Sequence, residues 1–261
     1  MQTNPHKEVL AVTGKGGVGK TTTTAIMAKL LIQRGVRPFV VDADPPVSLA
    51  YALGAEPTRT LGLFRQRLIE DPGEKRRVAQ SDRHMREFIY DDVLMEVNGV
   101  SLLVLGRAEG PGCFCGINEL LKFGIQSLSD RYAATLIDCE AGIEQINRLV
   151  VNRLTTLLIV SDASVKGIRT AEHLNQVAKE YAVNGSFRVG LVINKAKRDV
   201  GPLEARAKEI GLEVLGHIPD DENVAEFDFL GKPTLMLPDD SPCVNAVRKI
   251  MERLNLIEPA G

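Results

Sequence analysis

Tryptophan is absent from the chain, aromatic residues make up only 5% of it, and there are only four cysteines. So few aromatic rings argue against a protein that stacks the bases of single-stranded nucleic acids on aromatic side chains. Four cysteines in 261 residues are too few for a disulfide framework, which indicates a reducing compartment. The longest apolar runs, such as residues 100–105, fall far short of the ~20 residues of a membrane-spanning helix. These absences argue against a disulfide-rich secreted protein and an integral membrane protein.

An excess of charge of one sign is also missing. The chain has 32 Lys and Arg residues against 34 Asp and Glu residues, so its formal net charge is -2. A protein that binds nucleic acid or an acidic membrane through bulk charge carries a large basic excess, so neither partner is expected. The first eight residues lack the apolar core of a signal peptide. We therefore expect a cytoplasmic globular protein.

Short β-branched runs alternate with longer helical patterns along most of the chain. Continuous apolar strands that alternate with helices predict a doubly wound α/β fold, in which helices cover both faces of a mostly parallel sheet. The expected strands are 9–13, 39–42, 101–105, 134–138, 156–161, 188–194 and 213–218, and the clearest expected helices are 22–33, 166–181, 202–210 and 244–254. We expect a single domain over residues 1–261, with a variable, charge-rich helical insertion at about residues 55–98.

A glycine-rich segment directly follows the first expected strand and precedes a helix. It satisfies the pattern G-x-x-x-x-G-K-[ST], and its residues are Gly14, Lys15, Gly16, Gly17, Val18, Gly19, Lys20 and Thr21. The glycines let backbone N–H groups approach phosphate oxygens, and the helix N-terminus adds its positive dipole end. Lys20 is expected to neutralise the β- and γ-phosphates, and the hydroxyl of Thr21 is expected to ligate Mg²⁺. The segment, extended to Thr22, predicts a nucleotide site.

Lys15 distinguishes this loop from most others with the same pattern. A second lysine at this position resembles the deviant Walker A family, which includes the MinD/ParA partitioning ATPases, the nitrogenase iron protein, the arsenite pump ATPase and the CooC nickel-insertion ATPases. The resemblance covers essentially the whole chain except residues 55–98. It implies a P-loop ATPase that forms a face-to-face homodimer with ATP. In that dimer Lys15 would contact the partner's nucleotide and stabilise the transition state.

Three carboxylates at strand ends extend the resemblance. Asp44, just after the second expected strand, matches the acid that lies near the attacking water, and Asp42 is a candidate for the Mg²⁺ shell. Asp138, at the end of an apolar strand, matches the Walker B carboxylate that faces Mg²⁺. The resemblance thus implies catalytic roles for Lys15, Lys20 and Asp44.

Two later segments match the parts of the family that surround the base. Asn194 and Lys195 match the segment whose asparagine reads the adenine edge, and Pro219 and Asp220 match the loop that lines the base. Each segment alone would be weak evidence for a base-binding site, since Asn and Pro are common at strand ends. Together and in this order they favour ATP as the nucleotide.

Two of the cysteines form the motif Gly112-Cys113-Phe114-Cys115-Gly116, just before an expected helix. Two thiols at this spacing can share one soft metal ion, but they do not fill a four-coordinate site. Two copies of the motif in a symmetric dimer would supply four sulfur ligands for Ni²⁺, Zn²⁺ or an iron–sulfur cluster. The alternative is that the cysteines pack as small hydrophobic residues. We expect no metal-binding role for Cys139 and Cys243.

The C-x-C motif and the segment 138–144 resemble the CooC group within the family. That resemblance implies an ATP-hydrolysing, dimeric metallochaperone. It would assist nickel insertion into a client metalloenzyme such as carbon monoxide dehydrogenase, or act on a related nickel or iron–sulfur enzyme. Two alternatives stay open: an iron–sulfur cluster carrier or electron-transfer ATPase, and a MinD/ParA-like partitioning ATPase. Zinc fits a Cys₄ site as well as nickel does, so both metals stay open as well.

Overall fold

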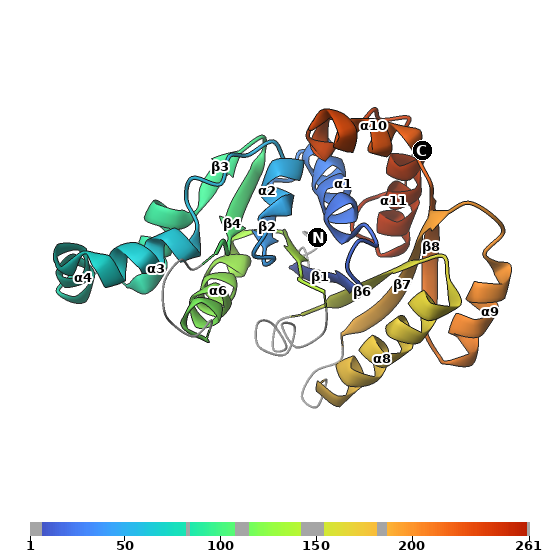
Figure 1. Cartoon of the computed structure of the whole chain (residues 1–261), viewed down its shortest axis with the longest axis horizontal. Coiled ribbons are helices and arrows are strands. Elements are labelled where there is room, and N and C mark those ends of the chain that lie inside the picture. Colours follow the sequence, from blue (N-terminus) through green and yellow to red (C-terminus); the bar gives the residue numbers. More distant parts are fainter. Residues whose placement is uncertain (1–6, 82–83, 108–114, 142–153, 182–186, 260–261) are drawn as a thin grey trace, which may run out of the picture.

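The computed structural model describes residues 7–81, 84–107, 115–141, 154–181 and 187–259. Within these residues, eight strands form one sheet in the order β3-β4-β2-β5-β1-β6-β7-β8 (Figure 1). All neighbouring strands run parallel except β3 and β4, which are antiparallel. The strands are β1 (Glu8–Gly14), β2 (Phe39–Asp42), β3 (Met95–Val97), β4 (Val100–Val104), β5 (Ala134–Asp138), β6 (Thr156–Asp162), β7 (Arg188–Ala196) and β8 (Glu213–Pro219). The predicted doubly wound, mostly parallel α/β fold is confirmed.

Helices cover both faces of the sheet (Figure 1). One face carries α1 (Lys20–Gln33), α2 (Ser48–Ala52), α10 (Glu222–Leu230) and α11 (Pro242–Arg253). The other carries α6 (Cys115–Leu128), α8 (Val165–Tyr181) and α9 (Gly201–Glu209). Short single-turn helices lie at Ser129–Arg131 and Thr234–Met236.

Each face of the sheet has its own hydrophobic core, because successive side chains of a strand point to opposite faces. In β1, Val9 and Ala11 belong to the core under α6 and α8, whereas Leu10 and Val12 belong to the core under α1 and α11. All four side chains are buried. This double burial explains why the parallel strands read as continuous apolar runs in the sequence.

Residues 55–98 contain α3 (Leu61–Glu70), α4 (Pro72–Ala79), α5 (Met85–Phe88), a π-helical turn (Ile89–Val93) and β3. The side chain of Asp71 caps α4 by accepting a hydrogen bond from the backbone N–H of Gly73 at 2.7 Å. On the exposed side of α4, Arg77 pairs with Glu74 at 2.8 Å and with Asp92 at 3.0 Å. The edge strand β3 was not predicted from the sequence.

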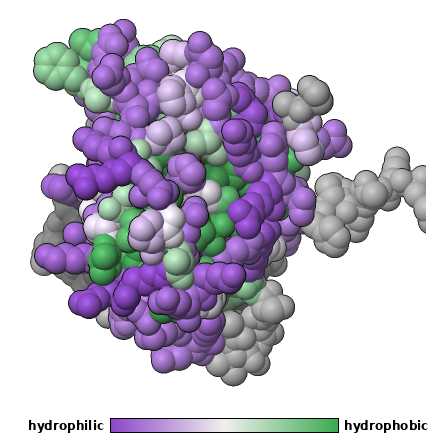
Figure 2. Space-filling view, turned by 90° about the vertical axis from the view of Figure 1, so that its right-hand side faces the viewer, coloured by the Kyte–Doolittle hydropathy of each residue, from purple (hydrophilic) through white to green (hydrophobic). Residues whose placement is uncertain are grey.

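The opposite edge of the sheet is β8. Figure 2, which faces the β8 and α9 side, shows hydrophilic residues around a smaller hydrophobic area. Glu213, the first residue of β8, pairs with Arg188 at 3.0 Å and with Arg253 at 3.4 Å. Charged groups at an edge strand discourage pairing with strands of other molecules.

The C-terminal helix α11 packs its apolar side against the sheet. Val244, Val247, Ile250 and Met251 are all buried, which follows the periodicity seen in the sequence. Across the described part of the chain, no helix combines the length and the apolar character that crossing a bilayer requires.

Candidate functional site

The glycine-rich loop joins the central strand β1 to α1 at the carboxyl edge of the sheet. Its first residue, Gly14, lies so close to β6 that a Cβ atom there would be 2.1 Å from the carbonyl oxygen of Val160. Gly17 and Gly19 have φ angles of 76° and 95°, in the region that favours glycine. Val18 is buried beneath the loop, and Lys15 is exposed on it. The local sequence therefore fixes a tight loop that only glycines permit.

Lys20 begins α1 and points back over the loop. Only 7% of the residue is exposed, and its Nζ donates a hydrogen bond to the carbonyl oxygen of Lys15 at 3.3 Å. Among the described residues, this buried ammonium group has one weak hydrogen-bond partner, so it is suited to neutralise an anion within the loop. The positive end of α1 points to the same place.

Asp42 and Asp138 are direct neighbours in the register of β2 and β5. Both are buried, and burial raises the pKa of each carboxyl to about 7. The hydroxyl of Thr21 donates to Oδ2 of Asp138 at 2.6 Å. Within the part of the chain that the structure describes, Oδ1 of Asp138 is buried and accepts no hydrogen bond. Burying a carboxylate oxygen without a hydrogen bond destabilises the folded protein unless a cation lies beside it.

Thr21 and Asp138 fit a magnesium ion. Mg²⁺ prefers oxygen ligands and is commonly held by one or two carboxylates together with the phosphates of its nucleotide. This mode needs no larger ligand cluster, and among the described residues no group of three or more His, Cys, Asp or Glu side chains could hold a metal. Asp42 is already used by the backbone, because its oxygens accept from the N–H groups of Ala50 at 3.1 Å and Asp44 at 3.3 Å.

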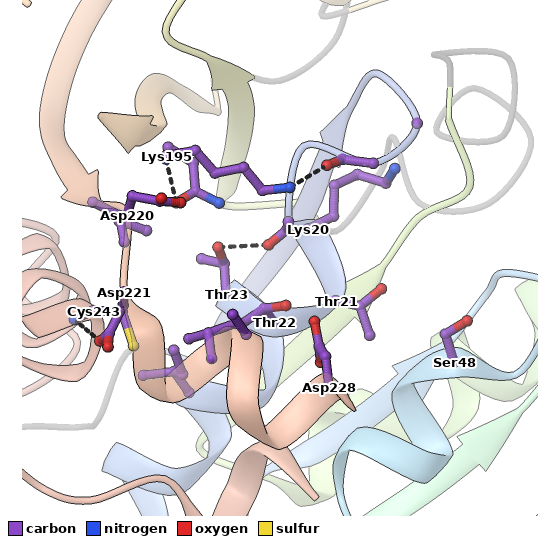
Figure 3. Close-up of a pocket in the computed structure, with 18 of the residues that line it drawn as sticks. Lys20, Thr21, Thr22, Thr23, Ser48, Lys195, Asp220, Asp221, Asp228 and Cys243 are labelled. Atoms are coloured by element: carbon purple, nitrogen blue, oxygen red, sulfur yellow. Dashed lines mark hydrogen bonds between the residues drawn. The ribbon is translucent and has the colours of Figure 1, made fainter. Parts of the chain in front are cut away.

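A cavity of about 770 Å³ opens beside the loop (Figure 3). The loop and the start of α1 form one wall, the ends of β7 and β8 with α10 form another, and Asp44 and Ser48 approach from the β2 side. Asp44 is half-buried, and burial raises the pKa of its carboxyl while the Lys20 ammonium opposes the rise. The volume lies within the range of small-ligand sites.

Most of the residues predicted from the sequence line this one cavity: Gly16, Gly17, Gly19, Lys20, Thr21, Thr22, Asp44, Asn194, Lys195, Pro219 and Asp220. Gly14, Lys15, Val18, Asp42 and Asp138 belong to the same edge of the sheet but do not line the cavity. Cys113 lies outside the described residues. Cys115 is the first residue of α6, and its side chain is outside the description.

Asp220 and Asp221 differ sharply in their surroundings. Asp220 is exposed and pairs with Lys197 at 3.1 Å. Asp221 is nearly buried and caps α10 by accepting from the backbone N–H of Asn223 at 3.0 Å. Its Oδ2 also accepts from the hydroxyl of Ser241 at 2.7 Å. The same oxygen accepts from the backbone N–H of Cys243 at 2.9 Å (Figure 3). Asp221 therefore ties the cavity wall to the start of α11.

The sequence interpretation did not include Asp221 in the site, nor Cys243, whose side chain lines the cavity. Both Cys139 and Cys243 are buried free thiols. Burial, with Asp221 nearby, raises the pKa of Cys243 to about 12, and burial also raises the pKa of Cys139. Further lining residues that were missed are Thr23, Ile26, Ser48, Glu140, Lys197, Val224, Ala225 and Asp228. Most belong to helices and carry no motif.

A glycine loop with a buried lysine, a carboxylate–hydroxyl pair suited to Mg²⁺ and a nucleotide-sized cavity define a P-loop ATPase. Residues 9–234 match the profile of the CobQ/CobB/MinD/ParA nucleotide binding domain. The chain therefore belongs to this family, and ATP with Mg²⁺ fits it. This confirms the predicted class of enzyme.

Sequence similarity to known proteins of this type extends over most of the chain. The chain is 35% identical to an uncharacterised ATP-binding protein of Methanocaldococcus jannaschii, over 94% of this chain and 98% of that protein. It is 31% identical to the carbon monoxide dehydrogenase accessory protein CooC of Rhodospirillum rubrum, over 85% of this chain and 87% of that protein.

Solved structures show the same fold. The cell division ATPase MinD of Pyrococcus furiosus superposes with a TM-score of 0.69 at 23% identity, over 96% of this chain and 99% of that one. A ParA family ATPase of Chlorobium tepidum superposes with a TM-score of 0.72 at 22% identity, over 97% and 100% of the two chains.

Proposed function

We propose that this ATPase is a dimeric metallochaperone that assists nickel insertion into a metalloenzyme such as carbon monoxide dehydrogenase. The observation that carries the proposal is the sequence pair Cys113 and Cys115, of which Cys115 begins α6. The 31% identity to the accessory protein CooC supports the client class. Two thiolates need a second pair to complete a four-coordinate site, which a two-fold dimer supplies.

The surroundings of α6 support a thiolate site. A Cβ atom on Gly116, the residue after Cys115, would lie 3.4 Å from Nε of Arg65 of α3. A guanidinium group and a helix N-terminus at the same place both stabilise nearby anions. Thiolates, rather than thiols, are the form that binds a metal.

In the proposed function, each residue around the phosphate loop has a role in ATP binding or hydrolysis. The loop N–H groups and Lys20 bind the phosphates, while Thr21 and Asp138 hold Mg²⁺, which supplies positive charge to the phosphates. Asp44 orients the attacking water rather than acting as a strong base. Lys15, exposed on the loop, is available to a second copy of the chain. Pro219 and Asp220 enclose the base.

ATP and metal are then coupled through the dimer. If ATP favours a closed dimer and only that dimer offers four thiolates, each ligand must raise the affinity for the other. Hydrolysis would reopen the dimer and release the metal to the client. The whole chain acts as one ATPase domain in this scheme.

The test is a Ni²⁺ titration, repeated with Zn²⁺, with and without a non-hydrolysable ATP analogue. We expect tighter binding with the analogue and one metal ion per dimer. Cys113→Ala/Cys115→Ala should abolish the site, whereas Cys139→Ala, which removes a buried thiol outside the cavity, should retain it. Equal affinity with and without the analogue would refute the coupling. Full metal binding by the first variant would refute the site.

Two alternative functions would be indicated by other experimental results. A brown chromophore and a cluster EPR signal after anaerobic purification would favour an iron–sulfur carrier instead. ATP-dependent co-sedimentation with DNA or liposomes would favour a MinD/ParA-like partitioning ATPase. Against membrane attachment through α11 stands the burial of its apolar side against the sheet.

A further inference from the structure

The end of β7 is irregular where it reaches the nucleotide cavity. Two residues of β7, Asn194 and Lys195, lie opposite a single residue of β8, Ile218, between two regular pairs of the parallel register. Lys195 has a φ angle of 56°, which is uncommon for a residue with a side chain. Such a bulge next to an active site redirects side chains.

The bulge turns two consecutive side chains toward the phosphate loop. Nδ2 of Asn194 donates to the carbonyl oxygen of Val18 at 2.7 Å, and Nζ of Lys195 donates to the carbonyl oxygen of Gly17 at 3.0 Å. In Figure 3, Lys195 reaches across the cavity to the loop. In a regular strand consecutive side chains point to opposite faces, so one of the two would be turned away. A hydrogen bond from the N–H of Lys195 to Oδ1 of Asn194, at 2.8 Å, stabilises the bulge.

These two hydrogen bonds determine how the loop peptides are oriented. The carbonyl groups of Gly17 and Val18 point toward β7. In a planar trans peptide the N–H points the opposite way, so the N–H groups of Val18 and Gly19 point away from β7. Successive N–H groups turned to one side are what a phosphate site requires. Asn194 packs so tightly that a Cβ atom on Gly19 would lie 2.2 Å from its Nδ2.

We propose that Asn194 and Lys195 form a clamp that holds the phosphate loop in its anion-binding conformation, with Lys195 as a positioning residue. This role differs from contact with the adenine, which the sequence resemblance implies for this segment. The Asn194 carboxamide bonds to Val18 and to the N–H of Lys195, and the ammonium of Lys195 bonds to Gly17 of the loop. The clamp is independent of the metal cargo and goes beyond the proposed function.

The test separates phosphate binding from base binding. Calorimetry in the presence of Mg²⁺ measures the affinity for a non-hydrolysable ATP analogue and for inorganic tripolyphosphate, which has no base or sugar. Lys195→Met keeps the aliphatic stem of the side chain. It should lower the affinity for both ligands by the same factor, about fivefold. Lys195→Arg, which can still donate to Gly17, should recover most of the affinity for both. Lys208→Met, at an exposed lysine of α9 away from the cavity, should change neither.

Two outcomes would overturn the proposal. If Lys195→Met weakens the ATP analogue but leaves tripolyphosphate unchanged, Lys195 acts on the base or sugar. If neither affinity changes, the hydrogen bond to Gly17 does not support the loop.

Lys195→Gly separates loss of the clamp from loss of the fold. Glycine suits a φ of 56°, so this variant should melt at the same temperature as the parent or higher. It should still bind tripolyphosphate about fivefold more weakly, because Nζ is gone. Parent-like tripolyphosphate binding by this variant would refute the clamp.

Discussion

Asp138 should make the ligand-free protein less stable at high pH than at low pH. Burial raises its pKa from 3.8 to about 7. Between about pH 4 and pH 7 the folded chain therefore keeps a proton that the unfolded chain has lost. The free energy of unfolding falls as pH rises through this window and stays low above it. A shift of this size corresponds to at most about 4 kcal/mol.

Asp138→Asn removes this penalty while keeping the shape of the side chain. Asp42 lies beside Asp138, with its pKa also raised to about 7, so the two carboxyl groups share the cost of ionisation. Asparagine also accepts a weaker hydrogen bond from Thr21 than a carboxylate does. After both reductions we expect the variant to be about 2 kcal/mol more stable than the parent at about pH 8. At about pH 4, close to the pKa of the unfolded chain, the two should differ by less than about 0.5 kcal/mol.

The assay is urea unfolding with a chelator and without nucleotide, so that no cation compensates the carboxylates. Asp240→Asn, at an exposed aspartate outside the cavity, is the matched control and should show no pH-dependent difference. A variant that is equally stabilised at both pH values would refute the reasoning. So would one that is destabilised at about pH 8, because burial of the charge would then not be its main cost.

Three further predictions concern the loop and the cavity wall. Gly19→Ala should weaken binding of an ATP analogue at least about tenfold in calorimetry, because its Cβ would lie 2.2 Å from Nδ2 of Asn194 at a φ of 95°. Unchanged affinity would show that the loop can move. Asp221→Ala removes the acceptor for the N–H of Cys243 and should lower the free energy of unfolding by about 2 kcal/mol in urea, whereas an effect below about 0.5 kcal/mol would contradict the hydrogen-bond network. Lys15→Ala should retain ATP binding but lose ATP hydrolysis and the ATP-dependent dimer, measured by phosphate release and sedimentation; a normal rate of hydrolysis would argue against its action across the dimer.

The central part of the fold could be predicted because parallel strands are buried on both faces. Their sequences are apolar runs such as Leu157–Val160. The edge strand β3 was missed although Asn98 and Gly99 form a recognisable hairpin turn, with φ angles of 45° and 86°. A strand of three residues has too few positions to show alternation.

Helix α10 was missed for a related reason. It contains no buried residue, so its sequence lacks the apolar periodicity by which surface helices are predicted. Its local signals are its caps: Asp221, which accepts from Asn223 at the start, and Gly231, with a φ of 64°, at the end.

The phosphate loop could be predicted because its residues are consecutive and each has a separate chemical task. The contacts of Lys195 could not, because its backbone conformation arises from the register between β7 and β8, which no local pattern encodes. The same holds for Cys243, which reaches the cavity from the far end of the chain through Asp221.

The hydrogen bonds between Asp221 and the start of α11 affect when the nucleotide cavity can be completed during protein synthesis. On the ribosome, the phosphate loop emerges more than 200 residues before Ser241 and Cys243 do. Until those residues are made, Asp221 lacks two of its donors. A nascent chain can therefore form the loop early, but the complete nucleotide cavity exists only once the last helix has been translated and has folded into place.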